Sequence, residues 1–134
     1  MIRIIVDTNW WISLLINSYD GQLTAILLRE DVVFCASQEL IDEVLTTVKY
    51  PKLAKYLKPE IVDEFAATFP QVVQIFKVST VVDVCKDSKD NFLLALSQDA
   101  EADFLITGDK DLLVLHIFGK TKILTLSDFI NANF

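Results

Sequence analysis

The chain has 134 residues, of which 52% are hydrophobic, and it carries a formal net charge of −7. This length predicts a single domain, residues 1–134, with a core of its own. No apolar run approaches the roughly 18–20 residues that cross a bilayer, and no signal-peptide pattern precedes the first strand, so we expect no membrane contact and a cytoplasmic location. The negative charge argues against nucleic-acid binding unless cations neutralise the carboxylates.

The first half of the sequence alternates short apolar runs, which suit strands, with segments whose apolar residues recur at helical spacing. Strands are expected at residues 2–6 and 32–36, and helices at residues 10–17, around 23–27, at 38–48 and at 60–69. Asp7, Thr8 and Asn9 follow the first strand directly and are good helix-capping residues, as is Ser37. Pro59 suits the first turn of the helix at 60–69, which we expect to close before Pro70.

The second half repeats this alternation less regularly. Residues 72–84 are rich in valine without clean alternation, which predicts one short strand and otherwise irregular chain. A helix from about residue 90 to 100, a strand at 102–106, a short helix at 111–116, a strand at 122–125 and a helix at 128–133 are expected to follow. Strands alternating with helices predict a three-layer α/β fold, in which a mostly parallel central sheet of about four to five strands is flanked by helices.

Four acidic residues are expected at one edge of this sheet. Asp7 ends the first strand and Glu43 lies on the helix after the second. Asp90 begins a later helix, and Asp109 follows a Thr-Gly turn after a strand. Ligands of open α/β folds bind at the carboxyl ends of the strands. Carboxylates gathered there favour hard divalent cations such as Mg²⁺ or Mn²⁺, and a pair of such ions can promote phosphodiester cleavage.

Each of these acidic residues also has an ordinary structural explanation. Asp7 would cap a helix, Asp90 would complement a helix dipole, Asp109 would suit a turn and Glu43 would be solvated. Periodicity does not separate Glu43 from Glu39 or Asp42, which lie on the same expected helix. The joint placement of the four residues on one expected edge nevertheless favours a shared site.

Cysteine and lysine patterns add two further expectations. Cys35 and Cys85 lack the spacing of zinc or disulfide sites, so we expect two buried thiols and no zinc. Four lysines recur every three residues, with two tyrosines among them and no acidic residue; they are Lys49, Lys52, Lys55 and Lys58, with Tyr50 and Tyr56. This basic segment predicts either an RNA-binding face or a plain solvated face, and the pattern does not choose between them.

Four motifs, in this order along the chain, resemble those of the PIN domain family. They are IVDTN at residues 5–9, Ser37 with ELIDEVL at 39–45, KDSKDN at 86–91 and ADFLITGDKDLL at 102–113. The resemblance spans nearly the whole chain and is greatest to the toxin-type PIN proteins related to VapC. It implies a PIN fold and the metal-dependent cleavage of single-stranded RNA with Mg²⁺ or Mn²⁺.

The same resemblance implies roles for individual residues. The implied catalytic quartet is Asp7, Glu43, Asp90 and Asp109, of which Asp7, Asp90 and Asp109 would hold the metal. Among the implied supporting residues, Asn9 and Thr107 would orient a ligand or water, and Asp87 and Asp111 are secondary candidates. The RNA contacts, expected from the basic segment and not from the resemblance, are Lys49, Lys52 and Lys55. A homodimer, held inactive by a cognate antitoxin, is implied as well.

Two other functions are compatible with the sequence. A phosphohydrolase could use Asp7 as the nucleophile of a phospho-aspartate, although haloacid-dehalogenase-like enzymes place a second Asp where this chain has Asn9. A non-catalytic module could keep the fold and bind metal or a basic partner segment through its carboxylates.

Overall fold

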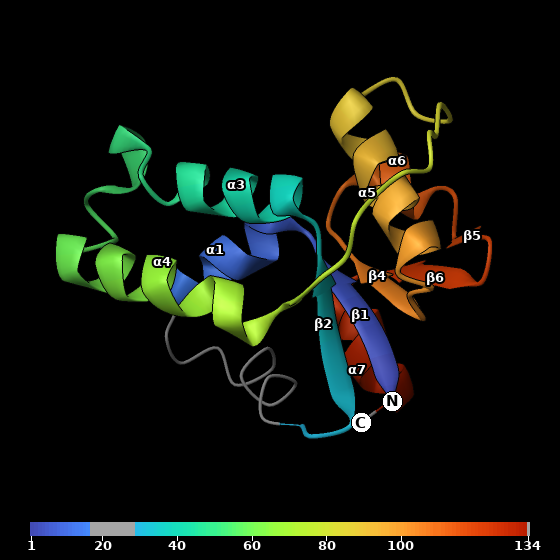
Figure 1. The fold of residues 1–134 in the computed structure, drawn as a ribbon, viewed down its shortest axis with the longest axis horizontal. Helices are drawn as coiled ribbons and strands as arrows, with labels where there is room; N and C mark the ends of the chain where they lie inside the picture. The colour runs from blue at the N-terminus through green and yellow to red at the C-terminus, as the bar shows by residue number, and fades with distance from the viewer. Residues whose placement is uncertain (17–28, 134) are drawn as a thin grey trace.

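The computed structural model describes residues 1–16 and 29–133 (Figure 1). Its strands are β1 (Ile2–Val6), β2 (Val32–Ala36), β3 (Gln74–Ile75), β4 (Phe104–Ile106), β5 (Ile117–Phe118) and β6 (Thr121–Leu124). Its helices are α1 (Thr8–Ile16), α3 (Gln38–Thr47), α4 (Pro59–Val72), α5 (Ser88–Asp99), α6 (Lys110–Leu113) and α7 (Leu126–Asn133), with a 3-10 turn, η1, at Pro51–Leu53. The helix expected around residues 23–27 lies outside the described residues.

The described strands form one sheet in the order β3-β2-β1-β4-β6-β5. Every neighbouring pair is parallel except β5 and β6, which are antiparallel. The predicted α/β class, with a mostly parallel central sheet flanked by helices, is therefore confirmed. The described sheet has six strands rather than four to five, because the two-residue β5 folds back on β6 through a turn at Gly119, whose φ is +59°.

The chain order reverses across β1, which places helices on both faces of the sheet. From β1 the chain moves to β2 and then β3, and right-handed connections put α1, α3 and α4 on one face. From β3 it crosses to β4 and β6, which puts α5 on the other face. Figure 1 shows α1, α3 and α4 together on the left of β1 and β2, with α5 on the right.

An aromatic cluster joins α1, β2 and α4. The Trp11 ring lies edge-on to Phe34 at 5.4 Å and to Phe69 at 5.0 Å between centroids, and Phe65 stacks on Phe69 at 5.0 Å. Truncating one such buried ring typically costs about 3–5 kcal/mol. The cluster fixes α1 against the sheet, and with it the residues at the start of α1.

Several element boundaries differ from the sequence-based expectation. Helix α1 begins at Thr8 rather than residue 10, because Asp7 already accepts the first helical hydrogen bond from Trp10 N at 3.0 Å. The expected end of α4 before Pro70 is wrong: the helix runs to Val72. Pro70 lies in the last turn, where its missing N–H removes a single hydrogen bond. Helix α7 begins at residue 126, two residues early.

Residues 76–87 contain no strand, in agreement with one short strand, β3, in the valine-rich region. Side chains of α5 bind this segment's backbone instead. The Asp99 carboxylate accepts from Ser79 N at 2.7 Å, and the Asn91 side-chain oxygen accepts from Val84 N at 2.9 Å and Cys85 N at 2.7 Å. These bonds fix the chain that leads into α5.

None of the described helices is long and apolar enough to cross a membrane.

Candidate metal centre

The reversal of strand order places a crevice at the carboxyl ends of β1 and β4, the usual ligand site of such sheets. These neighbouring strands are paired in register, Val6 with Ile106. The next residue on each strand is therefore level with its neighbour, and the two are Asp7 and Thr107. Both are buried, although both are polar. A buried polar pair at this point of the sheet marks the centre of the candidate site.

Asp7 is held in place by hydrogen bonds to both of its carboxylate oxygens. Oδ1 accepts from Thr8 N at 2.7 Å, and Oδ2 accepts from Thr107 Oγ1 at 2.8 Å. Burial raises the pKa of Asp7, while these two bonds and the nearby Lys89 ammonium oppose the rise. Thr107 therefore holds the Asp7 carboxylate in position, and its implied supporting role stays a prediction.

Glu43 is the acidic residue of α3 that contacts residues next to Asp7 and Asp90, which favours it over Asp42 for the quartet; its catalytic role stays a prediction. Its Oε2 accepts from Thr8 Oγ1 at 2.9 Å, and its Oε1 forms an ion pair with Lys89. Asp42 is exposed and accepts from Gln38 Nε2 at 2.9 Å instead. Two side chains, Thr8 and Lys89, therefore connect Glu43 to the crevice.

Asp90 lies in the first turn of α5 and is 3% exposed. Its Oδ2 is buried and has no hydrogen-bond partner among the described residues. Burial, together with the nearby Asp109, Asp87 and Asp7 carboxylates, raises the pKa of Asp90 to about 7. A buried carboxylate oxygen without a donor costs free energy, and a bound cation would remove that cost.

Asp109 and Asp111 supply further oxygens beside Asp90. Asp109 caps α6 by accepting from Asp111 N at 2.9 Å, and its own N–H donates to Thr107 Oγ1 at 3.1 Å. One carboxylate oxygen from each of Asp90, Asp109 and Asp111 lies within 4.8 Å of the others. An all-oxygen set with one unpaired member fits Mg²⁺ or Mn²⁺ better than a soft metal. These three residues could hold such an ion, with Asp7 beside them.

These carboxylates open into a pocket of about 340 Å³, called the acidic pocket below. Its lining residues are Asp7, Asn9, Trp10, Ser13, Asp87, Lys89, Asp90, Gly108 and Asp109. The structure therefore gathers Asp7, Asp90 and Asp109 of the expected quartet, with Asn9 and Asp87 of the supporting set. Asp111 lies next to this pocket as an oxygen neighbour of Asp90 and Asp109. Glu43 lies behind Lys89 rather than in the lining.

Lys89 and Trp10 line the acidic pocket but were not expected there. Lys89 is in the KDSKDN motif, yet its side chain had no visible partner in the sequence, because Glu43 is distant along the chain. Trp10 Nε1 is buried and has no hydrogen-bond partner among the described residues.

Cys35 is buried as expected, whereas Cys85 is only partly buried because it lies at the end of the irregular segment.

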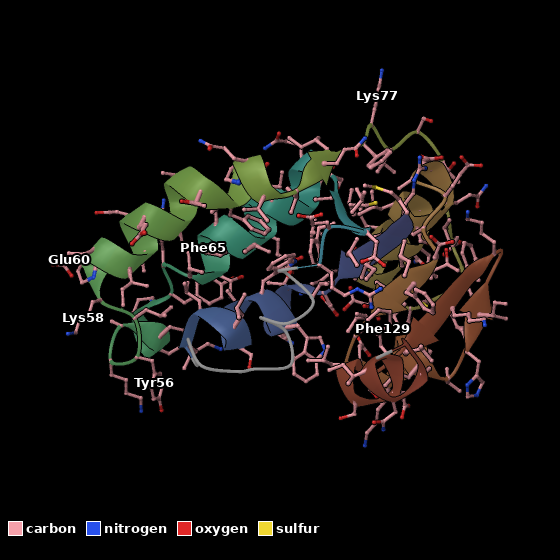
Figure 2. All side chains as sticks on the ribbon, turned by 90° about the horizontal axis from the view of Figure 1, so that it is seen from below. Tyr56, Lys58, Glu60, Phe65, Lys77 and Phe129 are labelled. Carbon is pink, nitrogen blue, oxygen red and sulfur yellow. The ribbon has the colours of Figure 1, made fainter. Side chains whose placement is uncertain are left out.

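The basic segment, residues 49–58, is not among the residues that line the acidic pocket. It follows α3 and contains η1, and Figure 2 shows Tyr56 and Lys58 at the outer end of the α3–α4 arm. The Lys55 ammonium lies 5.0 Å from the Tyr56 ring centroid, and that of Lys52 lies 5.8 Å from the Tyr50 ring centroid. Folding thus keeps the expected RNA contacts apart from the carboxylates.

Comparisons with known proteins agree with this architecture. A family model described as PIN domain matches residues 3–111. The uncharacterized protein MJ1680 of Methanocaldococcus jannaschii is 33% identical over 117 residues, which cover 85% of this chain and 75% of that protein. The crystal structure of PAE2754 from Pyrobaculum aerophilum has a TM-score of 0.63 at 14% identity, covering 98% of this chain and 88% of that one. The PIN domain of human SMG5 has a TM-score of 0.51 at 11% identity, covering 97% of each chain.

Proposed function

This chain belongs to the PIN domain family, and from that premise we propose that it is an endoribonuclease that cleaves single-stranded RNA with Mg²⁺ or Mn²⁺. PIN domains are generally metal-dependent nucleases, and the acidic group of this chain matches that chemistry. One observation carries the proposal: the buried, unpartnered Asp90 Oδ2 lies beside two further carboxylates at the topological switch of the sheet.

In this proposal, different residues bind the cation and orient Asp7. Asp90, Asp109 and Asp111 would hold the cation, with Asp7 on the adjoining wall. A bound divalent cation supplies positive charge to a phosphodiester and lowers the pKa of a water. Thr8 and Thr107 fix the orientation of Asp7 by the bonds they donate. Because they hold both oxygens in place, Asp7 is prepared to orient a water or a ligand without rearranging.

Pocket dimensions favour a single strand as the substrate. A volume of about 340 Å³ suits a phosphodiester and its immediate neighbours, whereas a duplex would have to enter a crevice that α1 and α5 border. The preference for RNA over DNA comes from the resemblance to toxin-type PIN proteins. Exposed lysines of the basic segment would bind phosphates farther along the strand.

The proposal extends to the biology of the chain. We place it in the cytoplasm as a homodimeric toxin whose cognate antitoxin holds it inactive. A basic side chain of the antitoxin, inserted into the acidic pocket, would form charge-assisted hydrogen bonds with the carboxylates that otherwise hold the cation. Competition between Mn²⁺ and an arginine-containing antitoxin peptide tests this part; independent binding of the two would refute it.

Cleavage of a labelled 20-nucleotide RNA tests the central proposal. We expect cleavage with Mg²⁺ or Mn²⁺, none in EDTA, and none after Asp109→Asn. Asp63→Asn, the same change at an exposed residue of α4, should leave cleavage intact. Tight Mn²⁺ binding without cleavage of any RNA would instead identify a non-catalytic metal-binding module. A trapped acyl-phosphate at Asp7 would identify a phosphohydrolase, which the two hydrogen bonds to Asp7 make the less favoured chemistry.

A further inference from the structure

A second hollow lies on the other side of the Lys89–Glu43 ion pair, between α3 and α5. Its volume is about 330 Å³, and its lining includes Glu39, Leu40 and Glu43 of α3 and Ser88, Lys89 and Phe92 of α5. We call it the α3–α5 hollow. Lys89 also lines the acidic pocket, so its side chain borders both spaces. The two spaces therefore meet at Lys89, and a ligand that reached from one to the other would pass this side chain.

Phe92 is an aromatic residue of α5 that the core does not use. Leu93, Leu94 and Leu96 belong to the hydrophobic core cluster, but Phe92 belongs neither to it nor to the residues packed against it. Its half-buried ring lines the α3–α5 hollow and also a groove of about 530 Å³ beside residues 78–83. Phe92 is one helical turn from Lys89, so the two side chains share a face of α5. A half-buried aromatic ring that lines a hollow suits stacking with a flat partner.

Charge decides what can enter the α3–α5 hollow. Glu39 and Glu43 lie along its α3 wall, so a phosphate placed there would be repelled. Among the described residues that line this hollow or the acidic pocket, Lys89 is the single basic one. A strand that crosses both spaces would therefore keep a phosphate at Lys89 and place an uncharged, flat group against Phe92.

From this arrangement we propose that the α3–α5 hollow is a nucleobase subsite. Phe92 stacks on the base next to the phosphodiester in the acidic pocket, and Lys89 contacts the phosphate between them. The inference rests on the proposed nuclease function and adds the part of the substrate that this function leaves open. It makes Phe92 a binding residue and Lys89 a positioning residue.

A double-mutant cycle between protein and RNA tests the subsite. An Asp109→Asn background keeps the RNA intact, and a set of eight-nucleotide RNAs, each lacking one base, is bound in Mn²⁺. Phe92→Leu should weaken binding of the complete RNA by about 5- to 160-fold, the range for losing one stacked base, and Phe92→Trp should not. Removal of one particular base should weaken binding to the parent equally, and should have no further effect on the Phe92→Leu protein.

Controls separate the failure of this inference from failure of the proposed function. Phe118→Leu makes the same change in β5, at the far edge of the sheet, and should leave RNA affinity unchanged. In the active enzyme, Phe92→Leu should raise KM more than it lowers kcat. If the wild type cleaves RNA but Phe92→Leu has wild-type KM and affinity, the subsite is refuted and the hollow is left to another occupant, such as an apolar side chain of a protein partner. If the wild type neither binds nor cleaves RNA with Mg²⁺ or Mn²⁺, the nuclease proposal fails and the subsite fails with it.

Discussion

The acidic pocket and the basic segment carry opposite charges and are assembled in opposite ways. The pocket collects carboxylates from residues far apart in the chain, and buries Asp7 and Asp90. The basic segment is ten consecutive residues with its lysines exposed and two of them over neighbouring tyrosine rings. A buried cluster of like charges depends on folding, pH and cations, whereas exposed lysines depend mainly on ionic strength. The net charge of the chain describes neither region.

Asp90→Asn is expected to give the largest effect, because it removes a charge that the pocket needs for a cation but cannot otherwise stabilise. Cleavage should fall by about 1,000-fold, as expected when several kcal/mol of transition-state stabilisation are lost. The melting temperature in EDTA at pH 8 should rise, because a buried, unpaired charge is removed. Calorimetry and RNA cleavage check the two effects. A variant that lost activity together with metal-free stability would show that Asp90 supports the fold instead.

Metal-free stability should fall as pH rises from about 4 to 7. The folded protein raises the pKa of Asp90 to about 7, so between the unfolded value and this one the folded state binds more protons. The stabilisation is complete below the unfolded pKa and is lost as pH passes the folded one. Melting in EDTA should therefore decrease between pH 5 and 8, on the order of 5 °C, and Mn²⁺ should restore it more at pH 8 than at pH 5. Equal restoration by Mn²⁺ at both pH values would contradict a cation bound to Asp90.

Thr107→Val should have an intermediate effect, because it removes a hydrogen bond to a carboxylate while keeping the shape of the side chain. We expect a loss of about 10-fold or more in kcat/KM, since Asp7 Oδ2 would lose its donor. Thr121→Val is the matched control: its buried hydroxyl donates to Ala102 O at 2.7 Å, away from the pocket. Both variants should lose stability, but Thr107→Val alone should lose activity. Similar kcat/KM values for the two variants would count against an orienting role for Thr107.

The double variant Lys52→Gln, Lys55→Gln should have the smallest effect and tests the two interpretations of the basic segment. If these lysines bind phosphates, RNA affinity should fall about 5-fold and the slope of log K against log salt should flatten by about 1.4. Lys120→Gln with Lys122→Gln makes the same charge change at the β5–β6 edge and should change neither quantity. Equal behaviour of the two double variants would make the basic segment a solvated face.

Sequence reasoning succeeded where a local signal coincides with a structural requirement. Apolar runs followed by capping residues located β1 and β2, and Ser37 caps α3 as expected by accepting a hydrogen bond from Leu40 N. The strand order could not be read locally, but alternation of strands and helices restricted the fold class to α/β. The acidic edge followed from that class, because helices that follow parallel strands begin at the carboxyl edge.

Other features depended on distances that the sequence does not contain. The choice of Glu43 over Asp42 required the position of Thr8 across two elements. The grouping of Asp111 with Asp90 and Asp109 required the relative positions of the first turns of α5 and α6. The path of residues 76–87 is set by Asn91 and Asp99, side chains that periodicity treats as surface polar residues. In each case a contact between distant residues overrode a weak local pattern.

The attachment of residues 76–87 to α5 has a practical consequence for protein engineering. Asp99 binds the backbone at Ser79 and Thr80, and Asn91 binds it at Val84 and Cys85, so the chain is anchored on both sides of Val81, which is 92% exposed. Foreign sequence inserted directly after Val81 would leave both anchors, and the approach to Asp87, unchanged. An epitope or a fluorescent reporter placed at this point would thus be held to α5 on both sides without disturbing the residues that line the acidic pocket.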